Sequence, residues 1–73
     1  MLTDAQARIA LKNILRNHLD NQSPELVQLE SLLDNLDRTI PIRGALETIR
    51  GNNISPYTEQ ELEIIKDLLY LYG

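Results

Sequence analysis

The chain has 73 residues, a net charge of −4 and no cysteine, and 42% of its residues are hydrophobic. These values indicate one small globular domain held by side-chain packing alone, and they exclude disulfide bonds and thiolate metal sites. The acidic balance argues against non-specific binding to nucleic acid, because neutralised phosphates supply most of that affinity. No apolar run approaches the roughly 20 residues of a membrane span, and no signal peptide is recognisable, so we expect a cytoplasmic protein.

The first predicted helix covers residues 4–20. Thr3 precedes the helix and Gln6 lies in its first turn, and their spacing is that of a capping box. Apolar residues, with one histidine, then repeat at helical spacing and predict the buried face. These residues are Ala7, Leu11, Ile14, Leu15 and His18.

The second predicted helix covers residues 24–37. Ser23 is the expected cap, and Pro24 occupies the first helical position, where its missing N–H costs nothing. Leucines dominate one face of this segment and predict its contact with the core. They are Leu26, Leu29, Leu32, Leu33 and Leu36.

The third predicted helix covers residues 40–50. Thr39 is the expected cap and Pro41 lies in the first turn, whereas Gly51 after a basic residue is typical of a helix end. The turn-rich segment 52–56 is the longest predicted connection. The apolar face of the helix consists of Ile42, Ala45, Leu46 and Ile49.

The fourth predicted helix covers residues 59–72. It begins with a capping box at Thr58 and Glu61, and Tyr57 with Leu62 fits a hydrophobic staple. Two apolar columns cover nearly half of its circumference, so it is either the central helix or presents one column to a partner or a second copy. The columns are Ile64, Leu68 and Leu71, and Ile65, Leu69 and Tyr72.

Short connections require consecutive helices to fold back on each other, and no segment has the alternation of a strand. The sequence therefore predicts an all-α fold, a compact antiparallel four-helix bundle with short loops, as a single domain over residues 1–73.

Groups for chemistry are scarce. His18 is the only histidine and lies on the apolar face, where a partly buried structural role is favoured, and a lone histidine without cysteine cannot build a standard zinc site. The serines have no histidine–aspartate partner, and no glycine-rich phosphate loop is present. We therefore predict no enzyme activity, no catalytic residue, no metal and no cofactor.

Surface residues suggest a binding role instead. Arg8, Lys12 and Arg16 form a basic ridge, which either pairs with acidic residues of neighbouring helices or docks an acidic partner; the acidic faces could likewise dock a basic one. A non-catalytic protein that acts by protein–protein contact is the main hypothesis, and a homodimer through the helix 59–72 is a further option. The candidate partner surface consists of Ile64, Leu68, Leu71, Tyr70, Tyr72, Arg8, Lys12 and Arg16.

The segments Ser23–Leu29, Ile40–Ile42 and Tyr57–Leu62, in this order along four helices, resemble enterocin A type (pediocin-like) bacteriocin immunity proteins. The resemblance implies a small cytosolic four-helix bundle that protects its producer cell by contact with a membrane receptor complex. This chain ends with the fourth helix, and the family's C-terminal specificity segment has no counterpart, so no family residue is carried over.

A small helix-turn-helix transcription regulator, or a phage-type regulatory factor, is the alternative hypothesis. The second and third helices would form the motif. Against it, Arg43 and Arg50 are the only basic residues of the would-be recognition helix, and the domain is acidic.

Overall fold

The computed structural model describes residues 2–52 and 56–73. Within these residues the chain forms four helices and no strand, so the predicted all-α, four-helix class is confirmed. The helices are α1 (Asp4–His18), α2 (Pro24–Asp34), α3 (Ile42–Asn52) and α4 (Glu59–Tyr72). Most of the predicted turn at 52–56 lies outside the described residues.

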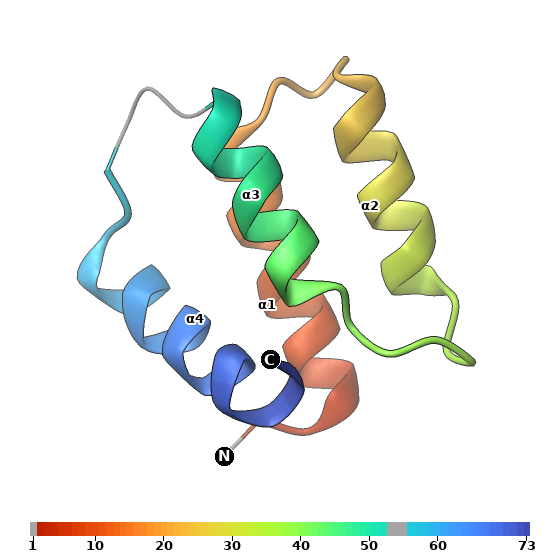
Figure 1. Ribbon diagram of the computed structural model, residues 1–73, viewed down its shortest axis with the longest axis vertical. Helices are drawn as coiled ribbons and strands as arrows, with labels where there is room; N and C mark the ends of the chain where they lie inside the picture. Colours follow the sequence, from red (N-terminus) through yellow and green to blue (C-terminus); the bar gives the residue numbers. More distant parts are fainter. Residues whose placement is uncertain (1, 53–55) are drawn as a thin grey trace.

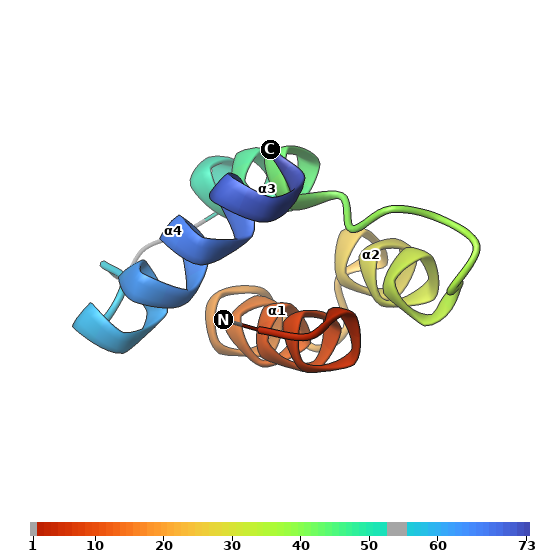
Figure 2. The ribbon, with the colours of Figure 1, turned by 90° about the horizontal axis from the view of Figure 1, so that it is seen from below.

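The other three helices pack around α1. Figure 1 shows α2 running opposite to α1 and α3, with α4 crossing obliquely below α3. In Figure 2, α3 and α4 lie on one side of α1, and α2 lies beside it. Because α1 contacts α2, α3 and α4, it is the central helix, and the interpretation that helix 59–72 is central is wrong.

Two helices begin as the sequence predicts. At α1, the Thr3 N–H donates to Gln6 Oε1 (3.0 Å) and the Gln6 N–H donates to Thr3 Oγ1 (3.2 Å). The equivalent bonds between Thr58 and Glu61 at α4 measure 2.9 and 3.1 Å. Both capping boxes therefore satisfy N–H groups that have no partner within the helix.

The helix α2 also begins at its predicted residue, Pro24, whereas α3 begins two residues later than predicted. Ser23 occupies the cap position of α2, but its hydroxyl donates to Glu25 Oε2 (2.5 Å) instead of accepting from the helix. At α3 the Ala45 N–H donates to the Pro41 carbonyl (2.9 Å), so the helix begins at Ile42. Thr39 is therefore exposed ahead of the helix, and its predicted capping role is wrong.

Helix ends also shift. The helix α2 ends at Asp34, three residues before the predicted end, where the Asn35 N–H turns to the Leu32 carbonyl (3.3 Å). Leu36 consequently lies outside the helix and is 76% exposed, so its predicted place on the buried face is wrong. The helix α3 continues through Gly51, which has no positive φ, so the predicted stop there is wrong as well.

One aliphatic core joins the helices. Leu19 and Ile40, which the predicted stripes omit, are buried because the chain turns back over the core beside α1 and α3. Leu68 of α4 is 0% exposed. The core consists of Ala7, Leu11, Ile14, Leu15, Leu19, Leu26, Leu29, Leu33, Ile40, Ile42, Ala45, Ile49, Ile65 and Leu68.

Candidate functional site

Each residue of the basic ridge of α1 bonds to α2. Arg8 is buried, and its guanidinium donates to the carbonyls of Leu33 (2.8 Å), Asn35 (3.2 Å) and Arg38 (2.5 Å). Its Nε donates to Asp4 Oδ2 (2.8 Å). A cation at the carbonyl end of a helix is favourable, so Arg8 holds the end of α2 on α1 and is withdrawn from the predicted partner surface.

The remaining ridge residues pair across the same interface. Lys12 contacts Asp34, and Arg16 Nη2 lies 2.6 Å from Glu30 Oε2. Pairs of this partly exposed kind contribute about 0–1 kcal/mol each. Of the two interpretations of the ridge, the structure therefore contains the pairing with acidic residues of a neighbouring helix. Lys12 and Arg16 are both paired with α2.

The predicted partner residues of α4 do not form one surface. Leu68 is core, and Ile64, Leu71 and Tyr72 are half-buried. The Tyr72 hydroxyl donates to Asp4 Oδ1 (3.2 Å), which ties the end of α4 to the start of α1. Tyr70, 81% exposed, is the one fully accessible member of the helix-four set.

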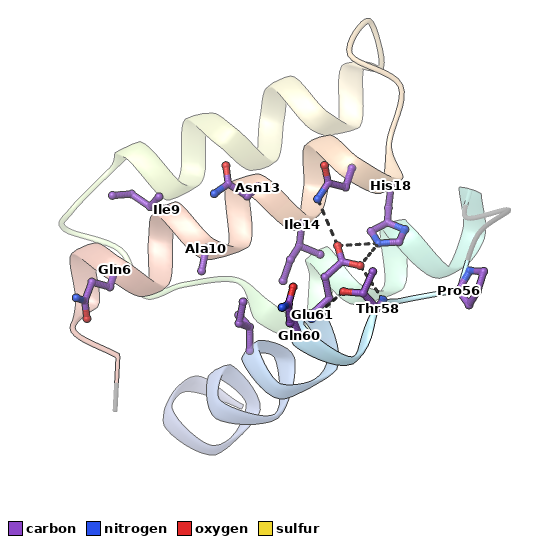
Figure 3. Close-up of a pocket in the computed structure, with 12 residues that line it drawn as sticks. Gln6, Ile9, Ala10, Asn13, Ile14, His18, Pro56, Thr58, Gln60 and Glu61 are labelled. Carbon is purple, nitrogen blue, oxygen red and sulfur yellow. Dashed lines mark hydrogen bonds and ion pairs between the residues drawn. The ribbon is translucent and has the colours of Figure 1, made fainter.

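A groove lies between α1 and the first half of α4. Its volume is about 660 Å³ (Figure 3). Apolar side chains from both helices form part of the lining, namely Ile9, Ala10, Ile14 and Ile64. Amide side chains interrupt them at Gln6, Asn13, Asn17 and Gln60.

His18 and Glu61 join the two walls at one end of the groove. His18 Nε2 lies 2.9 Å from Glu61 Oε1 and 3.0 Å from Oε2 (Figure 3). The contact is a hydrogen bond when the imidazole is neutral and an ion pair when it is protonated. The ring of Tyr57 packs on His18 with centroids 4.7 Å apart. The last residue of α1 is thereby fixed to the first turn of α4.

Opposing effects set the pKa of Glu61. Burial raises this pKa, but the Thr58 N–H, His18 and the Asn17 amide bind the carboxylate and bring the pKa below its ordinary value of 4.5. Burial and the neighbouring Glu61 charge raise the pKa of Tyr57. Glu61 is thus a carboxylate at neutral pH, held as part of the helix cap.

The pair has the arrangement of a structural latch. The side chain of His18 is 4% exposed and its Nε2 is held on Glu61, which leaves little of the imidazole for a ligand. Within residues 2–52 and 56–73, no group of three His, Cys, Asp or Glu side chains is placed to bind a metal ion. The groove consequently offers apolar contact and amide hydrogen bonds.

Sequence reasoning placed His18 near the end of a helix but did not identify Glu61 as its partner. The two residues are 43 positions apart, and Glu61 has a complete local explanation as a capping residue. Gln6, Asn13 and Asn17 have helical spacing on one face of α1, but nothing in the sequence places Gln60 of α4 opposite them. Only the crossing of α4 over α1 brings these residues together.

None of the described helices combines the length and the apolarity that a bilayer crossing requires. Comparisons with protein-family models, with curated proteins and with solved structures find no match to the chain.

Proposed function

We propose that this chain is a non-catalytic binding protein whose groove between α1 and α4 takes a basic, amphipathic segment of a partner protein. The observation that carries the proposal is an apolar, amide-rimmed groove, one wall of which is formed by α4, a helix whose exposed carboxylates lie outside the groove lining. Amphipathic helices bind grooves of this kind by placing their apolar face between two helices.

The form of the groove favours a peptide segment over a small molecule. Small-molecule sites enclose most of the ligand surface and converge a few polar groups on it. Here the exposed side chains of Gln6, Asn13 and Gln60 stand along an open groove. Such amides suit the polar edge of a bound helix.

Charge favours a basic partner. The helix α4 carries four carboxylates and only one cation, Lys66. Glu59, Glu63 and Asp67 are exposed. The three cations of α1, Arg8, Lys12 and Arg16, all bond to residues of α2. The exposed carboxylates of α4 lie outside the lining of the groove, so they would attract a cationic segment from the surface beside it.

A test uses two synthetic helical peptides with the same apolar face, one rich in lysine and one rich in glutamate. We expect the lysine peptide to bind and to shift the backbone amide resonances of α1 and α4 that line the groove. Gln60→Lys should weaken this binding at least about threefold, because it places like charge at the rim. The matched control is Gln28→Lys on α2, which should leave affinity unchanged.

Shifts outside the groove, or equal loss in both variants, would contradict the proposal. If the glutamate-rich peptide bound the groove equally well, the preference for a basic partner would be contradicted, but the groove would remain a binding site.

Protection against a bacteriocin is a specific form of this proposal. The four-helix fold is compatible with the resemblance to immunity proteins, and the role stays a prediction. Expression of the chain in bacteriocin-sensitive cells tests it, since an immunity protein raises the survival of those cells and an unrelated binding protein does not.

Two observations favour protein binding over a helix-turn-helix role. The connection from Asp34 to Ile42 is longer than the three- to four-residue turn of that motif. The net charge of −4 also disfavours contact with phosphates. A gel-shift with generic duplex DNA at low salt should show no complex, and a shifted band would restore the alternative.

A further inference from the structure

The carboxylate of Asp4, the first residue of α1, binds a different side chain with each of its two oxygens. Oδ2 accepts a hydrogen bond from Arg8 Nε (2.8 Å), and Oδ1 accepts one from the Tyr72 hydroxyl of α4 (3.2 Å). The Asp4 side chain is 54% exposed. An aspartate side chain that is half open to water samples several rotamers unless its partners hold it. Each of the two contacts therefore helps to keep the carboxylate in place for the other.

Arg8 extends this contact to the end of α2. Its guanidinium donates to the carbonyls of Leu33, Asn35 and Arg38 at the distances given above. A guanidinium is planar and rigid, so the Nε that binds Asp4 and the two Nη atoms that bind these carbonyls move together. A change in the position of the Asp4 carboxylate consequently changes how the guanidinium meets residues 33–38.

The segments joined in this way lie far apart in the chain and in space. Figure 2 shows α2 and α4 on different sides of α1. The ring of Tyr72 packs partly against the core, so the last turn of α4 determines where its hydroxyl lies. Tyr72 thus reports the position of this turn to Asp4, and Asp4 is in contact with the side chain that holds the end of α2.

We propose that Tyr72, Asp4 and Arg8 form a relay that couples the last turn of α4 to the end of α2, so that release of Tyr72 loosens residues 33–38. Tyr72 is the positioning residue, because its hydroxyl fixes the rotamer in which Asp4 Oδ2 faces Arg8. Coupling between separate elements is carried by hydrogen-bond networks of this kind. Because α4 also forms one wall of the groove, a partner that displaces its last turn would loosen the α2 end across α1. The relay itself does not depend on the proposed function.

Tyr72→Phe tests the relay, because it removes the hydroxyl and keeps the ring that packs on the core. We expect the NMR order parameters of the backbone amides of residues 35–38 to fall by at least about 0.1, which marks greater mobility. The Arg8 Nε–H should exchange with water at least about threefold faster, since its acceptor is less firmly held. The matched control is Tyr70→Phe, the same change at a residue of α4 that is 81% exposed, which should leave both measurements unchanged.

A second substitution shows whether the effect passes through Asp4. Asp4→Asn should loosen residues 35–38 at least as much as Tyr72→Phe does, and the double variant should loosen them no further, because both changes break the same relay. Circular dichroism melting confirms that the variants fold. The proposal would be overturned by unchanged order parameters at residues 35–38 in Tyr72→Phe or by an equal fall in Tyr70→Phe. A fall of the same size in the middle of α3, or additive effects in the double variant, would overturn it as well.

Discussion

Arg8 donates hydrogen bonds to carbonyl groups at the C-terminal end of α2 and just after it. Its guanidinium binds three carbonyl groups of residues 33–38 and the carboxylate of Asp4. The Arg8 hydrogen bond and charge hold the pKa of Asp4 below its ordinary value. A buried charge is tolerated when hydrogen bonds satisfy it, and here one side chain also closes a helix end.

We predict that Arg8→Ala lowers the free energy of unfolding by about 2–4 kcal/mol, because the carbonyl of Leu33 loses its side-chain donor in a buried position. Arg8→Lys should recover only part of this loss, since an ammonium group cannot reach several carbonyls in a fixed fork. Urea denaturation measures both. The exposed Arg43→Ala serves as the control and should change stability by less than about 0.5 kcal/mol.

Glu61 should contribute to stability in a pH-dependent way. Its pKa in the folded protein lies below the ordinary 4.5, so its contribution is present above about pH 4.5 and is lost as pH falls through the folded pKa. We predict that Glu61→Gln costs about 1–3 kcal/mol at neutral pH, through weaker bonds to Thr58 and His18. The difference between the two proteins should shrink as pH is lowered toward about 3.

Denaturant titrations at several pH values measure this difference. Glu47→Gln, on the exposed face of α3, is the control. A Glu61 difference that stays constant from neutral to acidic pH would show that the carboxylate charge is not what the latch uses.

At the scale of the element, α3 forms although part of its sequence has low helix propensity. Two glycines, Gly44 and Gly51, lie within this helix of 11 residues without a positive φ. Glycine in a helix interior is less favourable than alanine by roughly 0.5–1 kcal/mol. Burial of Ile42, Ala45 and Ile49 offsets the cost, because tertiary packing supplies most helix stability in proteins.

Gly44→Ala should therefore stabilise the protein by about 0.5–1 kcal/mol. A Cβ at this position meets nothing within 4 Å, so no clash opposes the gain in helix propensity. Thermal melting measures the change. The same substitution at Gly73 should not help, because a Cβ there lies 2.5 Å from the Leu69 carbonyl oxygen. A decrease in the melting temperature for Gly44→Ala would contradict this prediction.

At the scale of the molecule, the helices differ in how well they are held. The helix α1 contacts the three others, and α3 and α4 contact each other, whereas α1 is the main contact of α2 among the described helices. The molecule is flat, with extents of 28 × 26 × 16 Å. The helix with the fewest neighbours should be the first to open.

Native-state hydrogen exchange tests this expectation. We predict that amides in the middle of α2 exchange at least about tenfold faster than those in the middle of α1, because opening α2 breaks its main contact, with α1, whereas opening α1 breaks its contacts with three helices. Equal protection in the two helices would contradict it and would indicate that the whole domain opens as one unit.

Local features made much of the fold predictable. Both capping boxes join residues three positions apart, and the apolar faces of α1 and α3 repeat within a few residues, so each is complete in a short segment. The Thr39 cap, the stop at Gly51 and the buried place of Leu36 were predicted wrongly, because contacts with the rest of the chain decided those helix ends. Helix propensity alone predicts the first and last residues of a helix poorly.

By itself, the sequence determined the all-α class, three helix starts and most of the core, because capping and amphipathic spacing act over one or two turns. Only the tertiary structure decided that α1 is central, that its basic ridge pairs with α2, and that His18 meets Glu61 beside an apolar groove. These contacts join residues 14 to 43 positions apart, and which of many oppositely charged or apolar residues meet depends on how the helices cross.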